Sequence, residues 1–111
     1  MSLGLGGIVV IAALMLSGGS AFAETSANTI MPGCRAFLTQ SNRELWGSPF
    51  CAGVIVGLRA VPDISCEPDS VTTGQVVRVL VQYIDARPAR MHEDFRKLAL
   101  EAMKAAWPCQ R

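Results

Sequence analysis

The chain has 111 residues, a length that predicts a single domain. Its 10 basic and 9 acidic side chains nearly cancel and form no basic cluster, so nucleic acid is not an expected partner. A single histidine and the absence of a Cys-x-x-Cys pair argue against a bound metal, and no cofactor is predicted.

The first 23 residues have the pattern of a secretory signal peptide. An apolar run over residues 5–16 is followed by small residues and then by Ala21-Phe22-Ala23, an Ala-x-Ala cleavage site. No Lys or Arg precedes the run, so either the α-amino group supplies the positive charge or the true start codon lies upstream. The run is shorter than the ~20 residues that a membrane span needs. We therefore expect cleavage after Ala23, a mature domain over residues 24–111 in the periplasm, and no membrane attachment after cleavage.

Two helices are expected in the first half of the mature chain. The first begins around Pro32. A segment rich in turn formers follows, and its large apolar residue, Trp46, is expected to fold back on the core. The second helix spans residues 50–61 and is apolar almost all round, which predicts that it is buried. Gly53 and Gly57 are four residues apart on it and leave one side without bulk, where a neighbouring helix can approach closely.

The third predicted helix has a defined start and stop. Thr72 and Gln75 form a capping-box pattern at its beginning. Pro88 ends it, because proline disfavours the helical conformation in the residue before it. Apolar residues cover more than half of its circumference and leave one thin polar stripe, made by Arg78, Gln82 and Asp85. This helix is therefore expected to be central in the fold.

The fourth predicted helix covers residues 89–107 and follows the third after two or three residues, so the two are expected to be antiparallel. One apolar stripe faces the core, and a smaller apolar strip lies on the far side: Leu100, Met103 and Trp107. This strip is a candidate face for a symmetric dimer, because aromatic residues and methionine are enriched in interface cores. The alternative is that the first helix or the Trp46 segment covers it.

No stretch alternates with period two for long enough to form a strand. The sequence thus predicts an all-α fold, a small four-helix domain with two disulfides after a cleaved signal peptide, because four cysteines in a small exported domain usually pair. The antiparallel hairpin favours Cys66–Cys109, which leaves Cys34–Cys51. The pairing of Cys34 with Cys66 remains an alternative, since an up-and-down bundle also brings those two positions together.

No catalytic set is predicted, and the chain is not expected to be an enzyme. His92, Glu93 and Asp94 are consecutive, so on the predicted helix they point about 100° apart and do not converge. A binding surface is predicted instead at the turn after the third helix, where Pro88 stiffens an exposed, charged segment: Asp85, Arg87, Pro88, Arg90 and His92. The alternative is an ordinary turn between two helices.

Six short segments follow one another in a characteristic order along nearly the whole mature chain. They are Gly33-Cys34, Cys51-Ala52-Gly53-Val54-Ile55-Val56-Gly57, Cys66-x-Pro68, Val71-Thr72-x-x-Gln75, Tyr83-Ile84-Asp85-Ala86-Arg87-Pro88 and Trp107-Pro108-Cys109. In this order the chain resembles the Tai-type immunity proteins of the type VI secretion system and the related resistance-associated proteins. It departs from them at Ala52 and at Ile55-Val56, where some members carry an aromatic residue after the glycine.

The resemblance implies a small, all-helical, periplasmic protein that binds a peptidoglycan-cleaving amidase effector and blocks its active-site groove. The amidase is thus the expected protein partner. Members are often homodimers, so a second copy of the chain is a further candidate partner. Two other functions stay open: a small periplasmic chaperone of the acid-stress type, and an envelope domain without an enzyme partner.

Overall fold

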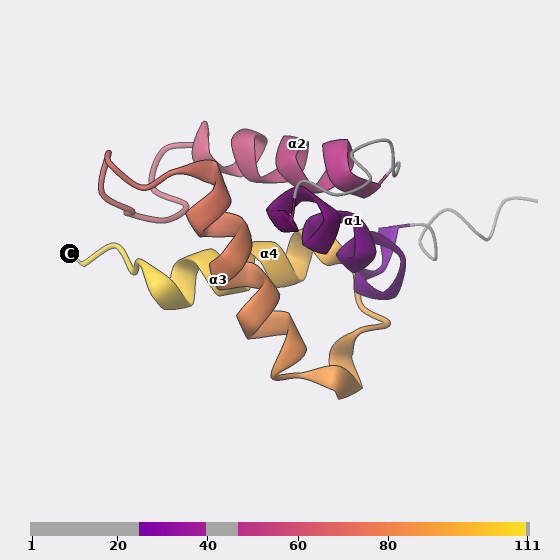
Figure 1. The fold of residues 1–111 in the computed structure, drawn as a ribbon. Helices are drawn as coiled ribbons and strands as arrows, with labels where there is room; N and C mark the ends of the chain where they lie inside the picture. Colours follow the sequence, from indigo (N-terminus) through magenta and orange to yellow (C-terminus); the bar gives the residue numbers. More distant parts are fainter. Residues whose placement is uncertain (1–24, 40–46, 111) are drawn as a thin grey trace, which may run out of the picture.

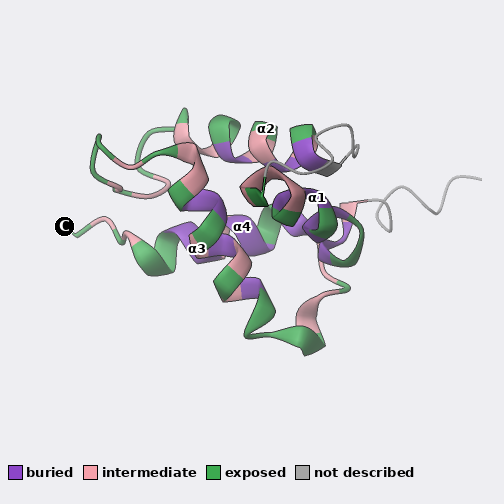
Figure 2. Ribbon diagram, viewed as in Figure 1, coloured by how far each residue is buried: buried purple, intermediate pink, exposed green. Residues whose placement is uncertain are grey.

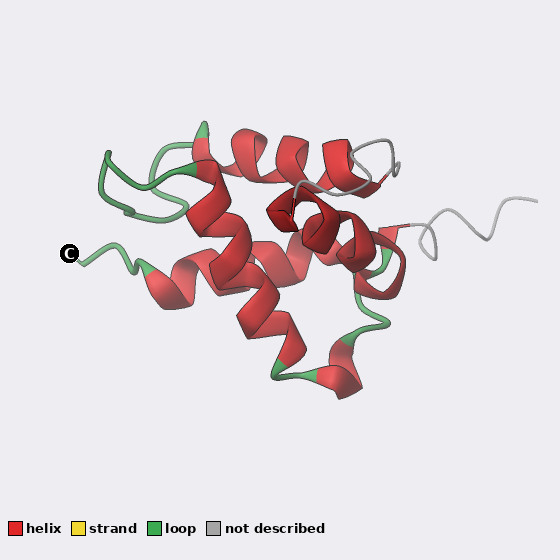
Figure 3. Ribbon diagram, viewed as in Figure 1, coloured by secondary structure: helices red, strands yellow, loops and turns green. Residues whose placement is uncertain are grey.

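The computed structural model describes residues 25–39 and 47–110, and these residues form helices and loops without a strand (Figure 3). The helices are α1 (Ala27–Thr39), α2 (Gly47–Arg59), α3 (Thr73–Asp85), the short 3-10 helix η3 (Pro88–Arg90) and α4 (Phe95–Ala106). The predicted all-α class, with four α-helices and two disulfides, is confirmed. The predicted signal peptide and the predicted position of Trp46 lie outside the described residues.

The core lies where the α-helices meet, and each of them contacts the other three (Figure 1). The aromatic rings of Phe50 and Phe95 connect α2 to α4 with 6.4 Å between their centroids. The buried apolar side chains form one cluster, purple in Figure 2: Ala27, Ile30, Met31, Cys34, Cys51, Ile55, Val76, Val77, Leu80, Ile84, Phe95, Leu98, Ala99, Ala102 and Met103. Helix α3 contacts every other α-helix, as expected, but so do α1, α2 and α4, so these contacts do not single it out as the central helix.

Helix α1 begins at Ala27, earlier than the expected start around Pro32. The first N–H groups of a helix need partners outside the helix, and the segment before α4 supplies two of them. The Ala27 N–H donates to the Glu93 carbonyl (3.0 Å), and the Asn28 N–H donates to the Met91 carbonyl (2.9 Å). Pro32 consequently lies inside the helix, on its exposed side. A local cap at Ser26, whose Oγ accepts from the Thr29 N–H at 3.4 Å, and the contact with this distant segment together fix the start.

Helix α2 is not the fully buried helix that its composition predicts. Cys51 and Ile55 face the core, whereas Gly53, Val56 and Gly57 are exposed. A methyl group added at either glycine would meet no neighbouring atom within 4 Å. The expected close approach of another helix is therefore wrong for the described part of this chain. An apolar pattern that runs all round a helix does not reveal which side faces the core.

Helix α3 has the predicted start and the predicted polar stripe. Thr72 Oγ1 accepts a hydrogen bond from the Gln75 N–H (3.1 Å), and Gln75 Oε1 accepts one from the Thr72 N–H (2.8 Å). Both halves of the capping box are thus present. Arg78, Gln82 and Asp85 are exposed along the helix, as the sequence predicts.

Helix α4 begins at Phe95 and not at residue 89. Asp94 caps it, because Asp94 Oδ1 accepts a hydrogen bond from the Arg96 N–H at 2.8 Å. Residues 86–94, which include η3, therefore connect α3 to α4, and the predicted two- or three-residue turn is wrong. The two helices are in contact, and in Figure 1 α3 runs across α4 instead of forming the expected antiparallel hairpin.

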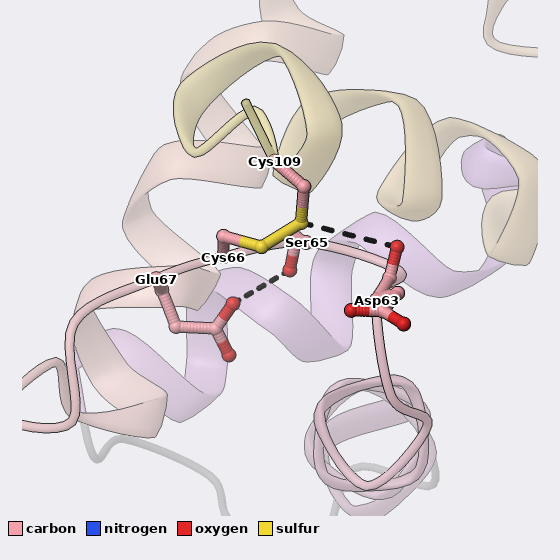
Figure 4. The surroundings of a disulfide bond; sticks show 5 residues. All are labelled: Asp63, Ser65, Cys66, Glu67 and Cys109. Carbon is pink, nitrogen blue, oxygen red and sulfur yellow. Dashed lines mark hydrogen bonds between the residues drawn. A yellow bond between two sulfur atoms is a disulfide. The ribbon is translucent and has the colours of Figure 1, made fainter. Parts of the chain in front are cut away.

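Both disulfides favoured by the sequence are present, and the alternative pairing of Cys34 with Cys66 is wrong. Cys34–Cys51 joins α1 to α2 inside the core, with 5.4 Å between the Cα atoms. Cys66–Cys109 joins the α2–α3 loop to the segment after α4, with 5.0 Å between the Cα atoms (Figure 4). The Cys66 N–H also donates to the Trp107 carbonyl (2.9 Å). These contacts bring the two segments together although the helices cross.

Candidate partner-binding surfaces

Residues 85–94 form a turn that projects from the helices at the bottom of Figure 1; we call it the α3–α4 turn. Figure 2 shows most of its outer part as exposed. Among the residues predicted to contact a partner, Arg90 is half-buried, and the others are exposed: Asp85, Arg87, Pro88 and His92. The turn therefore presents charged side chains and a proline at one end of the molecule.

Arg90 fastens the α3–α4 turn to α4. Its guanidinium donates two hydrogen bonds to Glu93 (2.6 and 3.0 Å) and two to Glu101 (2.8 and 3.0 Å). The hydroxyl of Tyr83 on α3 donates to the same Glu101 carboxylate at 3.2 Å. Bidentate pairs of this kind fix geometry as well as adding energy. In the free protein Arg90 thus stabilises the shape of the turn.

The other charged residues of the turn differ in how strongly they are held. Asp85 Oδ1 lies 2.7 Å from Nη2 of Arg35 on α1, but this pair is about half exposed and contributes little to stability. The Arg87 guanidinium lies 3.6 Å above the Tyr83 ring and donates to the Tyr83 carbonyl at 2.8 Å. His92 has no hydrogen bond or ion pair within the described chain. The imidazole of His92 is therefore available to a partner.

The arginines and Lys97 keep three carboxylates of this region ionised. Hydrogen bonds from Arg90 and then from Lys97 lower the pKa of Glu93 from 4.5 to about 2. A hydrogen bond from the Arg96 side chain lowers the pKa of Asp94 from 3.8 to about 2. The pKa of Glu101 is also lowered, first of all by its hydrogen bond from Arg90. The turn therefore keeps its ion pairs over the whole neutral and mildly acidic range.

We expect the melting temperature of the protein to fall as the pH is lowered from about 4.5 to about 2, the interval between the ordinary and the lowered pKa of Glu93. A carboxylate with a lowered pKa in the folded state contributes stability above its unfolded pKa and loses it as the pH falls through the folded value. In the Arg90→Met variant the decrease should be smaller, because the pKa values of Glu93 and Glu101 return toward normal. Circular dichroism melts would test this, with Lys104→Met as a control. Equal pH dependence in wild type and Arg90→Met would contradict it.

The predicted dimer strip is not a continuous surface. Met103 is fully buried, so its assignment to a dimer face is wrong. The inward stripe of α4 is Phe95, Leu98, Ala99, Ala102 and Met103, spaced i, i+3, i+4, i+7 and i+8. Trp107 is half-buried and packs against the core, and Leu100 is half-buried. For Met103 the alternative prediction is therefore the better one: other parts of the chain cover this residue, because it packs in the core.

The outer side of α2 is an uncharged, exposed surface, although the sequence analysis predicted that this helix is buried. Its exposed residues are spaced i, i+4, i+7, i+8 and i+11, so they lie on one face: Pro49, Gly53, Val56, Gly57 and Ala60. Val56 is 57% exposed. Arg59 at the end of the helix does not add charge to this face, because it binds Glu67 (3.0 Å) and the Val71 carbonyl (2.6 Å). We call these five residues the outer face of α2.

A pocket of about 480 Å³ opens where α1, α2 and α3 meet. Its lining residues are Phe37, Leu38, Ser48, Pro49, Ala52, Gly74 and Arg78. They come from the end of α1, the start of α2 and the start of α3. Sequence reasoning missed this site because no local pattern shows which helix ends come together. The one signal was Arg78, a charged residue in a largely apolar helix.

Glu93 and Asp94, two of the residues considered for a catalytic set, have structural contacts in the described chain. His92, Glu93 and Asp94 precede α4, so the helical geometry expected for them is wrong; Glu93 binds Arg90, and Asp94 caps the helix. Within residues 25–39 and 47–110, no three His, Cys, Asp or Glu side chains gather closely enough to hold a metal ion. In the same ranges, no helix has the length and apolar character that a membrane crossing requires.

Comparison with known proteins adds one finding. The model of the Rap1a immunity protein family matches residues 26–109, which include every described helix and both disulfides. No curated protein and no solved structure matches the chain. Immunity proteins of this kind act by binding a protein effector, in agreement with a fold that offers exposed surfaces. The chain belongs to the Rap1a family of immunity proteins.

Proposed function

We propose that this protein is a Tai-type periplasmic immunity protein that inhibits a peptidoglycan amidase delivered by a type VI secretion system. The observation that carries the proposal is the match of the Rap1a immunity family to residues 26–109. Two disulfides support a location outside the cytoplasm, because disulfides persist in oxidising compartments. The apolar start of the chain, with its Ala21-Phe22-Ala23 site, supports export by a signal peptide.

The protein inhibits by docking and not by chemistry. The α3–α4 turn is the segment that we assign to the amidase groove, with Arg87, Pro88 and His92 as the contact residues. Arg90 supports this role indirectly, since its ion pairs with Glu93 and Glu101 hold the turn in one shape before binding. A segment that is already ordered loses less conformational entropy on binding, which favours tight inhibition.

We expect the purified protein to inhibit, at a one-to-one ratio, a peptidoglycan amidase encoded beside its gene. Amidase activity on isolated peptidoglycan should fall linearly with added protein until equivalence. An amidase that retains full activity in the presence of a several-fold excess of the protein would reject the proposed target. A chaperone would instead bind unfolded chains without a fixed ratio.

Charge reversal in the α3–α4 turn should weaken this inhibition. Arg87→Glu changes an exposed residue whose main contact is the Tyr83 ring, and we expect an inhibition constant at least about ten-fold higher, the effect of losing one central interface residue. Lys104→Glu, an exposed residue without an ion pair in the described chain, is the matched control. Equal inhibition by the two variants would show that the turn lies outside the contact with the amidase.

A further inference from the structure

The pocket between α1, α2 and α3 combines an apolar wall with one charged residue. Phe37, Leu38, Pro49 and Ala52 supply the apolar part, and Arg78 supplies the charge. None of the described residues that line it is acidic. Its volume of about 480 Å³ falls in the range of about 300–1,000 Å³ that is usual for pockets that bind ligand groups. The pocket therefore suits an apolar group with a negative charge close by.

Arg78 differs from the other arginines of the described chain in lacking a partner. The arginines that bind carboxylates are Arg35, Arg59, Arg90 and Arg96. Arg87 lies on the Tyr83 ring. Arg78 is exposed and makes no hydrogen bond or ion pair within the described residues. No described residue occupies the planar set of donors of Arg78, which matches the geometry of a carboxylate.

Gly74 lines the α3 side of the pocket. It lies one helical turn before Arg78, so the two residues share a face of α3. A methyl group added at Gly74 would meet only Thr72 Oγ1, at 3.8 Å. The backbone there is ordinary helix without a positive φ, so the local conformation does not require glycine. Alanine would therefore fit here, and a larger side chain such as leucine is needed to occupy the α3 side of the pocket.

We propose that this pocket is a second contact site for the effector and receives an apolar side chain that adjoins an Asp or Glu in the effector sequence. The apolar side chain packs against Phe37, Leu38 and Pro49, and the carboxylate pairs with Arg78. This inference rests on the proposed inhibitory function, which it deepens by naming the chemistry of the bound segment.

The exposed stripe of α3 links the pocket to the α3–α4 turn. Arg78, Gln82 and Asp85 lie on it at i, i+4 and i+7, a span of about 10 Å along the helix. One effector molecule that contacts the turn is therefore within reach of the pocket without passing round the domain. The outer face of α2 begins at Pro49, which also lines the pocket, so apolar surface continues beyond it.

Two matched pairs of variants test the inference with the amidase encoded beside the gene. Arg78→Glu reverses the pocket charge, and Lys104→Glu makes the same change on α4. Gly74→Leu fills the pocket, and Ala105→Leu places the same side chain at an exposed position of α4, away from the candidate binding surfaces. We expect Arg78→Glu and Gly74→Leu each to raise the dissociation constant at least about ten-fold, and their partners to change it less than about two-fold.

A second measurement does not depend on the amidase. The peptides acetyl-Phe-Glu-amide and acetyl-Phe-Gln-amide are titrated into the protein, and amide chemical shifts are followed by NMR. We expect the Glu peptide to shift the signals of Ala52, Gly74 and Arg78 and to bind about three-fold more tightly than the Gln peptide, as one solvated ion pair would give. Arg78→Gln should remove this difference. Circular dichroism confirms that each variant remains folded.

The outcomes separate the two ideas. If the amidase binds the wild type and both pocket variants equally, the pocket inference is wrong and the proposed function stands. If the amidase does not bind the wild type, the proposed function fails and the peptide titration alone decides whether the pocket has the assigned chemistry. A pocket that another segment of the chain fills would bind neither peptide, which overturns the inference. If Gly74→Leu changed the molecular mass of the protein in solution but left amidase binding unchanged, the pocket would be a contact with a second copy of the chain. The pocket inference would then be wrong.

Discussion

Replacing both Cys66 and Cys109 by serine is expected to lower the free energy of unfolding by about 4 kcal/mol, on the chain-entropy model for a bridge across 43 residues. The bridge restricts the unfolded chain far more than the folded one. In the folded chain the same segments are also joined by the hydrogen bond from the Cys66 N–H to the Trp107 carbonyl. Urea denaturation of the oxidised wild type and of the double variant, followed by circular dichroism, measures the difference.

The second bridge provides the comparison for this experiment. Cys34–Cys51 closes only 17 residues, which gives about 3 kcal/mol on the same model. Both of its cysteines are fully buried, so replacing them by alanine also leaves a small cavity in the core. The two double variants should therefore lose similar stability for different reasons. If the double variant Cys66→Ser/Cys109→Ser lost less than about 1 kcal/mol of unfolding free energy, packing alone would hold the end of the chain in place.

The Phe95→Ala variant is expected to lose about 3–5 kcal/mol of folding free energy, the usual result of removing a large buried aromatic ring. Among the described residues Phe95 is the largest fully buried side chain, and its ring centroid lies 6.4 Å from that of Phe50. It is also the first residue of α4, directly after the cap at Asp94. The cavity would thus open where α2 and α4 meet.

Because small domains are stable by only about 5–15 kcal/mol, Phe95→Ala should be largely unfolded at moderate urea concentrations at which the wild type is native. Val56→Ala is the control, since Val56 is 57% exposed and its truncation should change stability by less than about 0.5 kcal/mol. Equal loss of stability in the two variants would contradict the assignment of Phe95 to the core. Urea titrations of both variants, read by circular dichroism, give the comparison.

Local chemistry allowed the sequence to determine the helical class and the main features of α3. The capping pair Thr72 and Gln75 and the stop at Pro88 involve residues only a few positions apart. The sequence analysis predicted both disulfides correctly, but the antiparallel hairpin used to argue for them was a wrong prediction. Cys66 and Cys109 do lie beside each other, although α3 crosses α4 and the hairpin that motivated the pairing is absent.

The tertiary structure alone decided the features that depend on groups far apart in the chain. Carbonyls of Met91 and Glu93 satisfy the first N–H groups of α1 from a distant segment. The start of α4 is different, because its cap at Asp94 is a local signal that the sequence analysis missed. The composition of α2 is apolar all round, so only its neighbours determine that Cys51 faces inward and Val56 outward. The pocket arises in the same way, because three helix ends meet there. Periodicity reports which residues share a face of one helix, whereas packing between helices decides what that face touches.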